Sequence, residues 1–151
     1  MRIERRGFAP ILYAAVTLFA VAGWASWSHA DKPGATPETG EQQAAEGGKL
    51  FAKHCAKCHG KAGEGTKKAP PVVGKDALPL DPPAGAKIRK TQFHTAQDVA
   101  EFVSTKMPAN KPGSLKADQY YDILAFDLKA NGVDVSGKKI DPTTAAEIKL
   151  H

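Results

Sequence analysis

The chain has 151 residues, and its 42% hydrophobic and 25% charged residues are ordinary for one globular domain. Its net charge is +5 at pH 7. Residues 1–30 contain three arginines and one glutamate, so without them 18 basic and 15 acidic residues remain, a net charge of +3. This mildly basic balance suits an acidic protein partner and is too small to indicate nucleic-acid binding.

The first thirty residues have the pattern of an export signal. Three arginines lie within the first six positions, an apolar block covers residues 11–25, and small residues follow at Ser28 and Ala30. The block is shorter than the roughly 20 apolar residues that span a membrane. We therefore expect cleavage after Ala30 and a periplasmic protein. The alternative is that the segment is kept as a membrane anchor.

The rest of the chain divides into three parts. Residues 31–43 are rich in Pro, Gly, Thr and acidic side chains, which predicts a flexible linker. Residues 44–132 predict a compact domain, and residues 133–151 predict a C-terminal tail. No strand alternation and no internal repeat is visible, so we expect an all-α fold in which helices alternate with long loops.

The first two helices are predicted from the absence of breakers and from a cap. Residues 44–57 contain few helix-breaking residues apart from two glycines, and they are predicted to form the first helix. For residues 95–106, Thr95 can cap the helix with Asp98 three positions on. Between them, residues 60–93 form a loop that is unusually long for a compact domain unless something else organises it.

Two further helices are predicted toward the C-terminus. The pattern after Ser114 predicts a long helix that stops at Asn131 and Gly132. Asp141 before Pro142 is typical of an N-cap and first helical residue, so a short helix is expected in the tail.

Both cysteines lie in the stretch "KHCAKCHG", as Cys55 and Cys58, and His59 follows directly. Tetrahedral zinc needs a second pair of ligands that this chain lacks, and a thioredoxin-like dithiol would follow a strand. A structural disulfide leaves His59 unexplained. The pattern C-x-x-C-H instead indicates covalent haem c, with both thiols bonded to the haem vinyl groups and His59 bound to the iron.

The ligand opposite His59 determines what such an iron can do, because an iron with two protein ligands can mainly pass electrons. Met107 is the one methionine beyond the export signal, and it stands before Pro108 after a predicted helix end. A thioether opposite a histidine is the pairing of the cytochromes c. The alternatives are that Met107 fills a gap in the core and that His94 is the ligand.

These residues resemble the class I c-type cytochromes over residues 47–132. The likeness rests on Gly47 with an aromatic residue four positions on, on the attachment motif, on the Pro70–Val73 run, on Met107-Pro108 and on the last long helix. The resemblance implies that the carbonyl of Pro71 orients His59. It also implies that the first and last helices cross at Gly47, near Ile123 or Phe126.

The resemblance implies a periplasmic electron carrier with one haem c, and we expect no enzyme activity from the chain by itself. Two alternatives remain: a ligand-binding haem sensor, or the electron-transfer subunit of a larger dehydrogenase complex. Lysines surround the attachment motif and bracket Met107. They indicate either a surface that serves solubility alone or a positive rim for redox partners with an acidic docking surface. The lysines are Lys53, Lys57, Lys61, Lys67, Lys68, Lys106 and Lys111.

Overall fold

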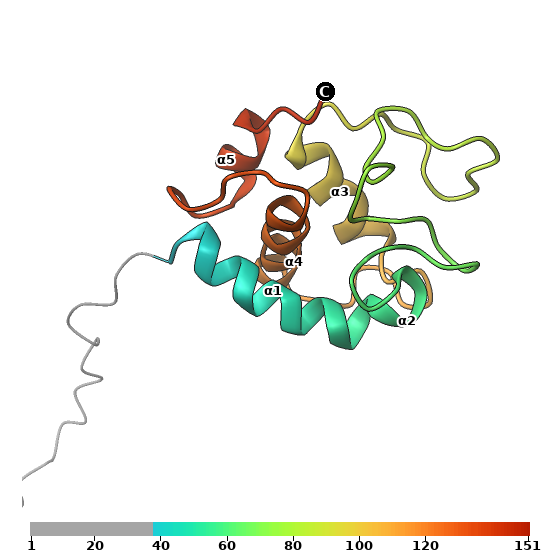
Figure 1. Cartoon of the computed structure of the whole chain (residues 1–151), viewed down its shortest axis with the longest axis horizontal. Helices are drawn as coiled ribbons and strands as arrows, with labels where there is room; N and C mark the ends of the chain where they lie inside the picture. The colour runs from blue at the N-terminus through green and yellow to red at the C-terminus, as the bar shows by residue number, and fades with distance from the viewer. Residues whose placement is uncertain (1–37) are drawn as a thin grey trace, which may run out of the picture. The chain divides into compact units, whose positions relative to one another are not determined.

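The computed structural model describes residues 38–151. Five helices follow one another: α1 (Gly40–His54), α2 (Ala56–His59), α3 (Ala96–Lys106), α4 (Ala117–Ala130) and α5 (Pro142–Glu147) (Figure 1). The described residues form no strand, and one isolated bridge pairs Thr95 with Lys149. The all-α fold is therefore confirmed. The predicted export signal lies outside the described residues.

Helix α1 begins earlier than the sequence suggested. Thr39 is its N-cap, and the Thr39 and Gln42 side chains each accept a hydrogen bond from the other residue's backbone amide. Residues 40–43 are helical rather than part of the linker predicted for 31–43. This capping box satisfies amide groups that would otherwise lack partners at the helix start, which is why the helix extends back to Gly40.

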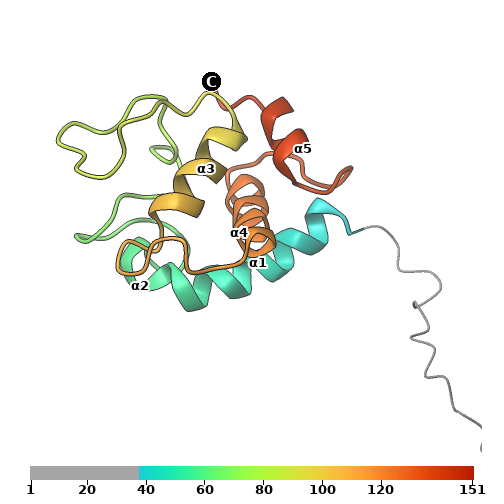
Figure 2. The ribbon, with the colours of Figure 1, turned by 180° about the vertical axis from the view of Figure 1, so that it is seen from behind.

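Helices α1 and α4 cross at Gly47. A Cβ atom built there would lie 1.8 Å from the backbone oxygen of Asp122 and 2.9 Å from the backbone nitrogen of Ile123. Next to this contact, the ring centroids of Phe51 and Phe126 lie 5.2 Å apart. The close approach predicted near Ile123 is thus present, and both views show α1 lying against α4 (Figures 1 and 2).

Helix α3 matches its predicted range, and α4 does not. Thr95 and Asp98 form the expected capping box at the start of α3. Helix α4 begins at Ala117 instead of Ser114, because the side chain of Gln119 accepts a hydrogen bond from the Lys116 amide and closes the first turn there. The main core fills the space between these two helices and the C-terminal segment. Its buried residues include Phe93, Ala96, Val99, Leu124, Ala125 and Leu128.

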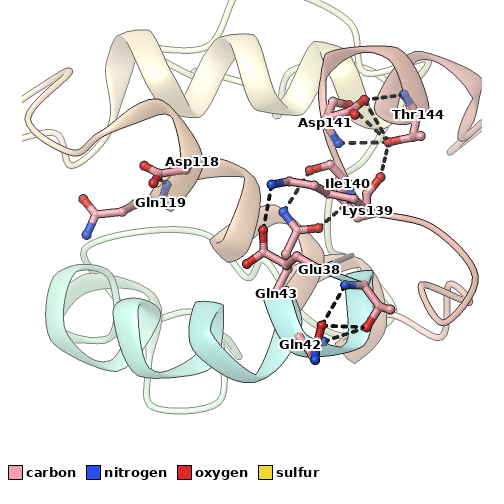
Figure 3. Close-up of polar contacts among 10 residues, drawn as sticks. Glu38, Gln42, Gln43, Asp118, Gln119, Lys139, Ile140, Asp141 and Thr144 are labelled. Carbon is pink, nitrogen blue, oxygen red and sulfur yellow. Dashed lines mark hydrogen bonds and ion pairs between the residues drawn. The ribbon is translucent and has the colours of Figure 1, made fainter. Parts of the chain in front are cut away.

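Residues 133–151 pack into that same core. Val135, Ile140 and Ala145 are almost completely buried. The buried side chain of Gln43 donates to the carbonyl of Ile140 at 2.9 Å and accepts from its amide at 2.6 Å, which joins α1 to this segment (Figure 3). The short helix predicted after Asp141 is present as α5, with the Asp141 carboxylate accepting from the amides of the first turn.

No helix among residues 38–151 combines the length and the apolar character that crossing a membrane requires.

Candidate haem site

The two cysteines lie at the junction of α1 and α2. Cys55 ends α1 and is half-buried, whereas Cys58 is exposed, and neither forms a disulfide. The amides of Cys58 and His59 both bond to the carbonyl of Cys55, each at 3.0 Å. Residues three and four positions apart on a helical turn share a face. The turn therefore presents both thiols and the imidazole on one side.

The thiol of Cys55 is poorly suited to binding a metal directly. Burial, then the nearby charge of Asp127, then Cys58 raise the pKa of Cys55 to about 12. A thiol coordinates metal as a thiolate, which such a pKa disfavours. Within residues 38–151, no three His, Cys, Asp or Glu side chains gather where they could hold a metal ion.

The imidazole of His59 is oriented by one backbone carbonyl. Its Nδ1 lies 2.8 Å from the carbonyl oxygen of Pro70. Because a carbonyl only accepts hydrogen bonds, Nδ1 must carry the proton, and the neutral ring keeps the lone pair of Nε2 available for a metal. In metal-binding histidines, the ring nitrogen that does not bind the metal usually donates a hydrogen bond in this way.

The orienting residue is Pro70 and not Pro71, which corrects the assignment made from the resemblance. Both prolines offer a carbonyl and lack an amide, so the sequence alone could not distinguish them. The turn before them decides the register, because the Thr66 amide bonds to the Ala69 carbonyl at 2.9 Å. Gly65 packs closely against Pro71, since a Cβ atom built on Gly65 would lie only 2.7 Å from the Pro71 nitrogen.

Met107 lies at the end of α3, on the loop that leads to α4. Its amide closes the helix on Val103, and its carbonyl accepts a hydrogen bond from the Tyr120 hydroxyl at 2.8 Å. The side chain is half-buried. His94, the rival ligand, is exposed before the opposite end of α3, and its ring contacts the Gln92 side chain.

One face of α4 joins both sides of the site. Tyr120, Ile123, Asp127 and Asn131 follow one another at helical spacing on this face. At one end Tyr120 holds the Met107 loop. At the other end Asn131 donates to the carbonyl of Val72 at 2.8 Å and accepts from the Gly74 amide at 3.0 Å. We call these four residues the α4 face.

Sequence reasoning missed the α4 face, because no pattern assigned a role to Tyr120 and Asn131 indicated only a helix stop. Asn131 is indeed the C-cap, and its side chain also fastens the loop that follows Pro70. The available signal was that a helix-stop residue such as Asn131 has a side-chain amide that can also bond to a loop. Nothing in the sequence marked Asp127.

These parts fit a covalent haem. The attachment turn offers two unpaired thiols, the Pro70 contact leaves the right nitrogen of His59 available, and a half-buried thioether stands on a separate loop. Together the helical fold and this turn define a c-type cytochrome domain. Residues 42–126, more than half of the chain, match the family described as cytochrome c oxidase, cbb3-type, subunit III, and the chain belongs to that family. It is therefore an electron-transfer protein with covalent haem c.

Two curated proteins are similar to the chain. It is 32% identical to the thiosulfate dehydrogenase of Psychrobacter arcticus over 123 residues, covering 71% of the chain and 35% of that protein. It is 33% identical to the thiosulfate dehydrogenase of Stutzerimonas stutzeri over 87 residues, covering 54% of the chain and 25% of that protein. The chain thus spans about a third or less of each relative.

A solved structure supports the fold. The chain superposes on the sulfane dehydrogenase SoxCD from Paracoccus pantotrophus with a TM-score of 0.51 and 24% identity, covering 74% of this chain and 58% of that one.

The expectation that the chain is not an enzyme is wrong by this comparison, because both curated relatives carry the names of dehydrogenases. In each relative the match is partial and covers only the segment that corresponds to this cytochrome domain. No motif indicated an enzyme, since the recognised motifs belong to the haem site and not to a substrate site.

Proposed function

We propose that the protein carries electrons away from the oxidation of thiosulfate or a related sulfur compound, as the cytochrome part of a dehydrogenase. The similarity to two thiosulfate dehydrogenases carries this proposal. It extends the predicted alternative of an electron-transfer subunit in a larger complex. The periplasm is the proposed location, in agreement with the predicted export signal.

Within the site, we assign thioether bonds to Cys55 and Cys58 and axial ligation to His59 and Met107. The hydrogen bond from His59 to Pro70 is the observation that supports the proximal ligand. Met107 is preferred to His94 because its loop is fixed to the α4 face through Tyr120, whereas His94 is exposed before the N-terminal end of α3. Bound haem supplies a one-electron centre whose potential a thioether ligand raises.

The visible spectrum of the holoprotein tests this ligand set. The oxidised protein is expected to show the weak long-wavelength band of sulfur bound to ferric iron. Met107→Ala should abolish this band and let the reduced protein bind carbon monoxide, while the control His94→Ala should behave as the unmodified protein does. A band that survives Met107→Ala, or one that disappears in His94→Ala, contradicts the assignment. Carbon monoxide binding to the unmodified protein would favour the sensor alternative.

The sulfur chemistry has a separate test. Oxidised holoprotein is mixed, without oxygen, with thiosulfate and the periplasmic extract of its source organism, and haem reduction is followed by absorbance. Reduction should require thiosulfate. Reduction at the same rate without thiosulfate would contradict the proposal and would leave the ligand assignment intact.

The lysines named above form the proposed docking surface for the redox partner. All seven are exposed, and none pairs with a carboxylate in residues 38–151. An acidic partner would be guided toward such a surface, so its rate of electron transfer should fall as salt is raised. A rate that does not change with ionic strength would exclude electrostatic docking.

A further inference from the structure

Asp127 is a buried acid that the electron-transfer role does not use. Its side chain lies on the α4 face and the residue is 5% exposed. Its Oδ1 atom is fully buried and has no hydrogen-bond partner among the described residues. Burial raises the pKa of Asp127 well above its ordinary value. A buried carboxyl group is costly when it is ionised without a partner, so it needs either a compensating charge or a bound proton.

The position of Asp127 connects it to the haem attachment point. Its charge acts on the thiol of Cys55, the residue to which we assign a thioether bond. One turn earlier, Ile123 belongs to a small cluster with Cys55, Ala56 and Val72. One turn later, Asn131 bonds to the backbone carbonyls of both Asp127 and Val72. The inference therefore rests on the proposed attachment at Cys55.

No charged side chain among the described residues neutralises Asp127. At the α1–α2 junction the group coupled to Asp127 is the Cys55 thiol, whose pKa the charge of Asp127 helps to raise, and this thiol is no longer ionisable once bonded to haem. The charged groups of the helices packed on α4 have other surroundings. Glu41 pairs with Lys129, Glu46 pairs with Lys49, Asp98 caps α3, and Lys53, Glu101 and Lys106 are exposed.

We propose that Asp127 is a proton-binding site coupled to the haem, which takes up one proton when the haem gains an electron and releases it when the electron leaves. Ferric haem carries one more positive charge than ferrous haem, so it favours the Asp127 carboxylate. When a one-electron donor removes that charge, the carboxylate binds a proton from water. Oxidation by a one-electron acceptor returns the proton to water, and the net charge of the site stays nearly constant.

The sign of the coupling follows from this charge. The carboxyl binds its proton more tightly in the ferrous state. At pH values between the pKa of Asp127 in the ferric state and its pKa in the ferrous state, the reduction potential therefore falls as pH rises. A tenfold difference in proton affinity corresponds to a total fall of about 59 mV for a one-electron couple. An opposite charge lowers the proton affinity of a neighbouring carboxyl by about tenfold or more. A fall of this order is the result expected for Asp127.

The test is a redox titration of the purified holoprotein at a series of pH values. Asp127→Asn keeps the shape of the side chain and removes its ionisation. This variant should lose the Asp127 part of the pH dependence, about 59 mV or more, and should have the higher potential at alkaline pH. The haem propionates contribute equally in both proteins and leave the same residual slope. A pH dependence that is unchanged in Asp127→Asn overturns the proposal.

Asp122 provides a matched control on the same helix. It is also buried, at 8% exposure, and burial raises its pKa, but its side chain interacts with Gln43 near the N-terminal end of α1, whereas Cys55 lies at the C-terminal end. Asp122→Asn should keep the pH dependence of the unmodified protein. If it removes that dependence as fully as Asp127→Asn does, the effect is not specific to Asp127 and the proposal is wrong.

A second measurement covers the case in which Asp127→Asn fails to take up haem. Infrared difference spectra between the reduced and oxidised forms are recorded on protein with carbon-13 labelled aspartate, using Asp122→Asn as the background. A protonated carboxyl band that appears on reduction and shifts with the label is expected. Its absence overturns the proposal. Absence of covalent haem would instead contradict the proposed function, so the two failures are distinguishable.

Discussion

At Gly47 the backbone of α1 touches the backbone of α4, and this contact can be tested by a single methyl group. In Gly47→Ala the new Cβ would lie 1.8 Å from the Asp122 carbonyl oxygen. An ordinary carbon–oxygen contact is about 3.3 Å, so the helices would have to separate by roughly 1.5 Å. Neither neighbour can give way by rotating a side chain, because the clashing atoms are backbone.

The cost can be compared with that at the adjacent position. Overpacking of this kind costs about 1–3 kcal/mol, and a backbone clash belongs at the upper end. Alanine in a helix gains up to about 1 kcal/mol over glycine, which leaves a net loss of about 2 kcal/mol. In Gly48→Ala the nearest atom is on the Phe126 ring at 3.3 Å, which can shift, so this control should be neutral or slightly stabilising.

Denaturant unfolding of the holoproteins, followed by haem absorbance and circular dichroism, gives the free energies of unfolding. Because both variants gain the same helix propensity, their difference isolates the clash with α4. If Gly47→Ala is as stable as Gly48→Ala, the helices do not cross as closely as the structure shows, and the reasoning is refuted.

Three further predictions concern buried or half-buried polar groups. Asn131→Ala leaves the Val72 carbonyl without its partner and should lower the free energy of unfolding by about 2 kcal/mol, with faster proteolysis of residues 60–93. Gln43→Ala removes both bonds to Ile140 and should cost about 3 kcal/mol in the same assay. Asp127→Asn should raise the stability of the ferrous holoprotein at pH 7. Burial raises the folded pKa of Asp127, so the unmodified protein loses stability as pH rises above the unfolded pKa of about 4, and the advantage of the variant should vanish near that pH.

Exposed residues serve as controls for these variants. Asn110→Ala and Glu46→Ala change the surface, where the Glu46 ion pair with Lys49 is worth about 0.5 kcal/mol or less. If either control costs as much as Asn131→Ala or Gln43→Ala, the hydrogen bonds do not explain the loss. An advantage of Asp127→Asn that persists unchanged at pH 4 would contradict the titration of that carboxyl.

The parts of the fold that depend on neighbouring residues could be predicted from the sequence. The cap of α3 joins Thr95 to Asp98, three positions on, and the cap of α5 joins Asp141 to Thr144 at the same spacing. The attachment turn is likewise a motif of five residues. Thr39 and Gln42 form the same kind of cap, but the surrounding proline, glycine and acidic residues indicated a linker, so the start of α1 was missed.

Features that depend on distant contacts could not be predicted. Gln43 bonds to a residue 97 positions away, and no local pattern indicates that the tail after residue 132 packs into the core. The choice between Pro70 and Pro71 also depends on tertiary structure, because it is set by a turn and by the packing of Gly65. The buried Asp127 was missed for the same reason, since a helical aspartate is usually exposed.

The α4 face explains how the two proposed iron ligands, which come from distant parts of the chain, are kept in place. Tyr120 fixes the loop of Met107, and Asn131 fixes the loop that follows Pro70, the residue that orients His59. These anchors are 11 residues apart on one rigid helix, or roughly 16 Å. A change on either loop must therefore work against the same helix, which Gly47 holds against α1. An iron whose ligands are supported in this way needs little rearrangement when its charge changes. Among the described residues, Asp127 is the buried acid whose side chain has an oxygen without a hydrogen-bond partner, so its proton and the electron are expected to move together.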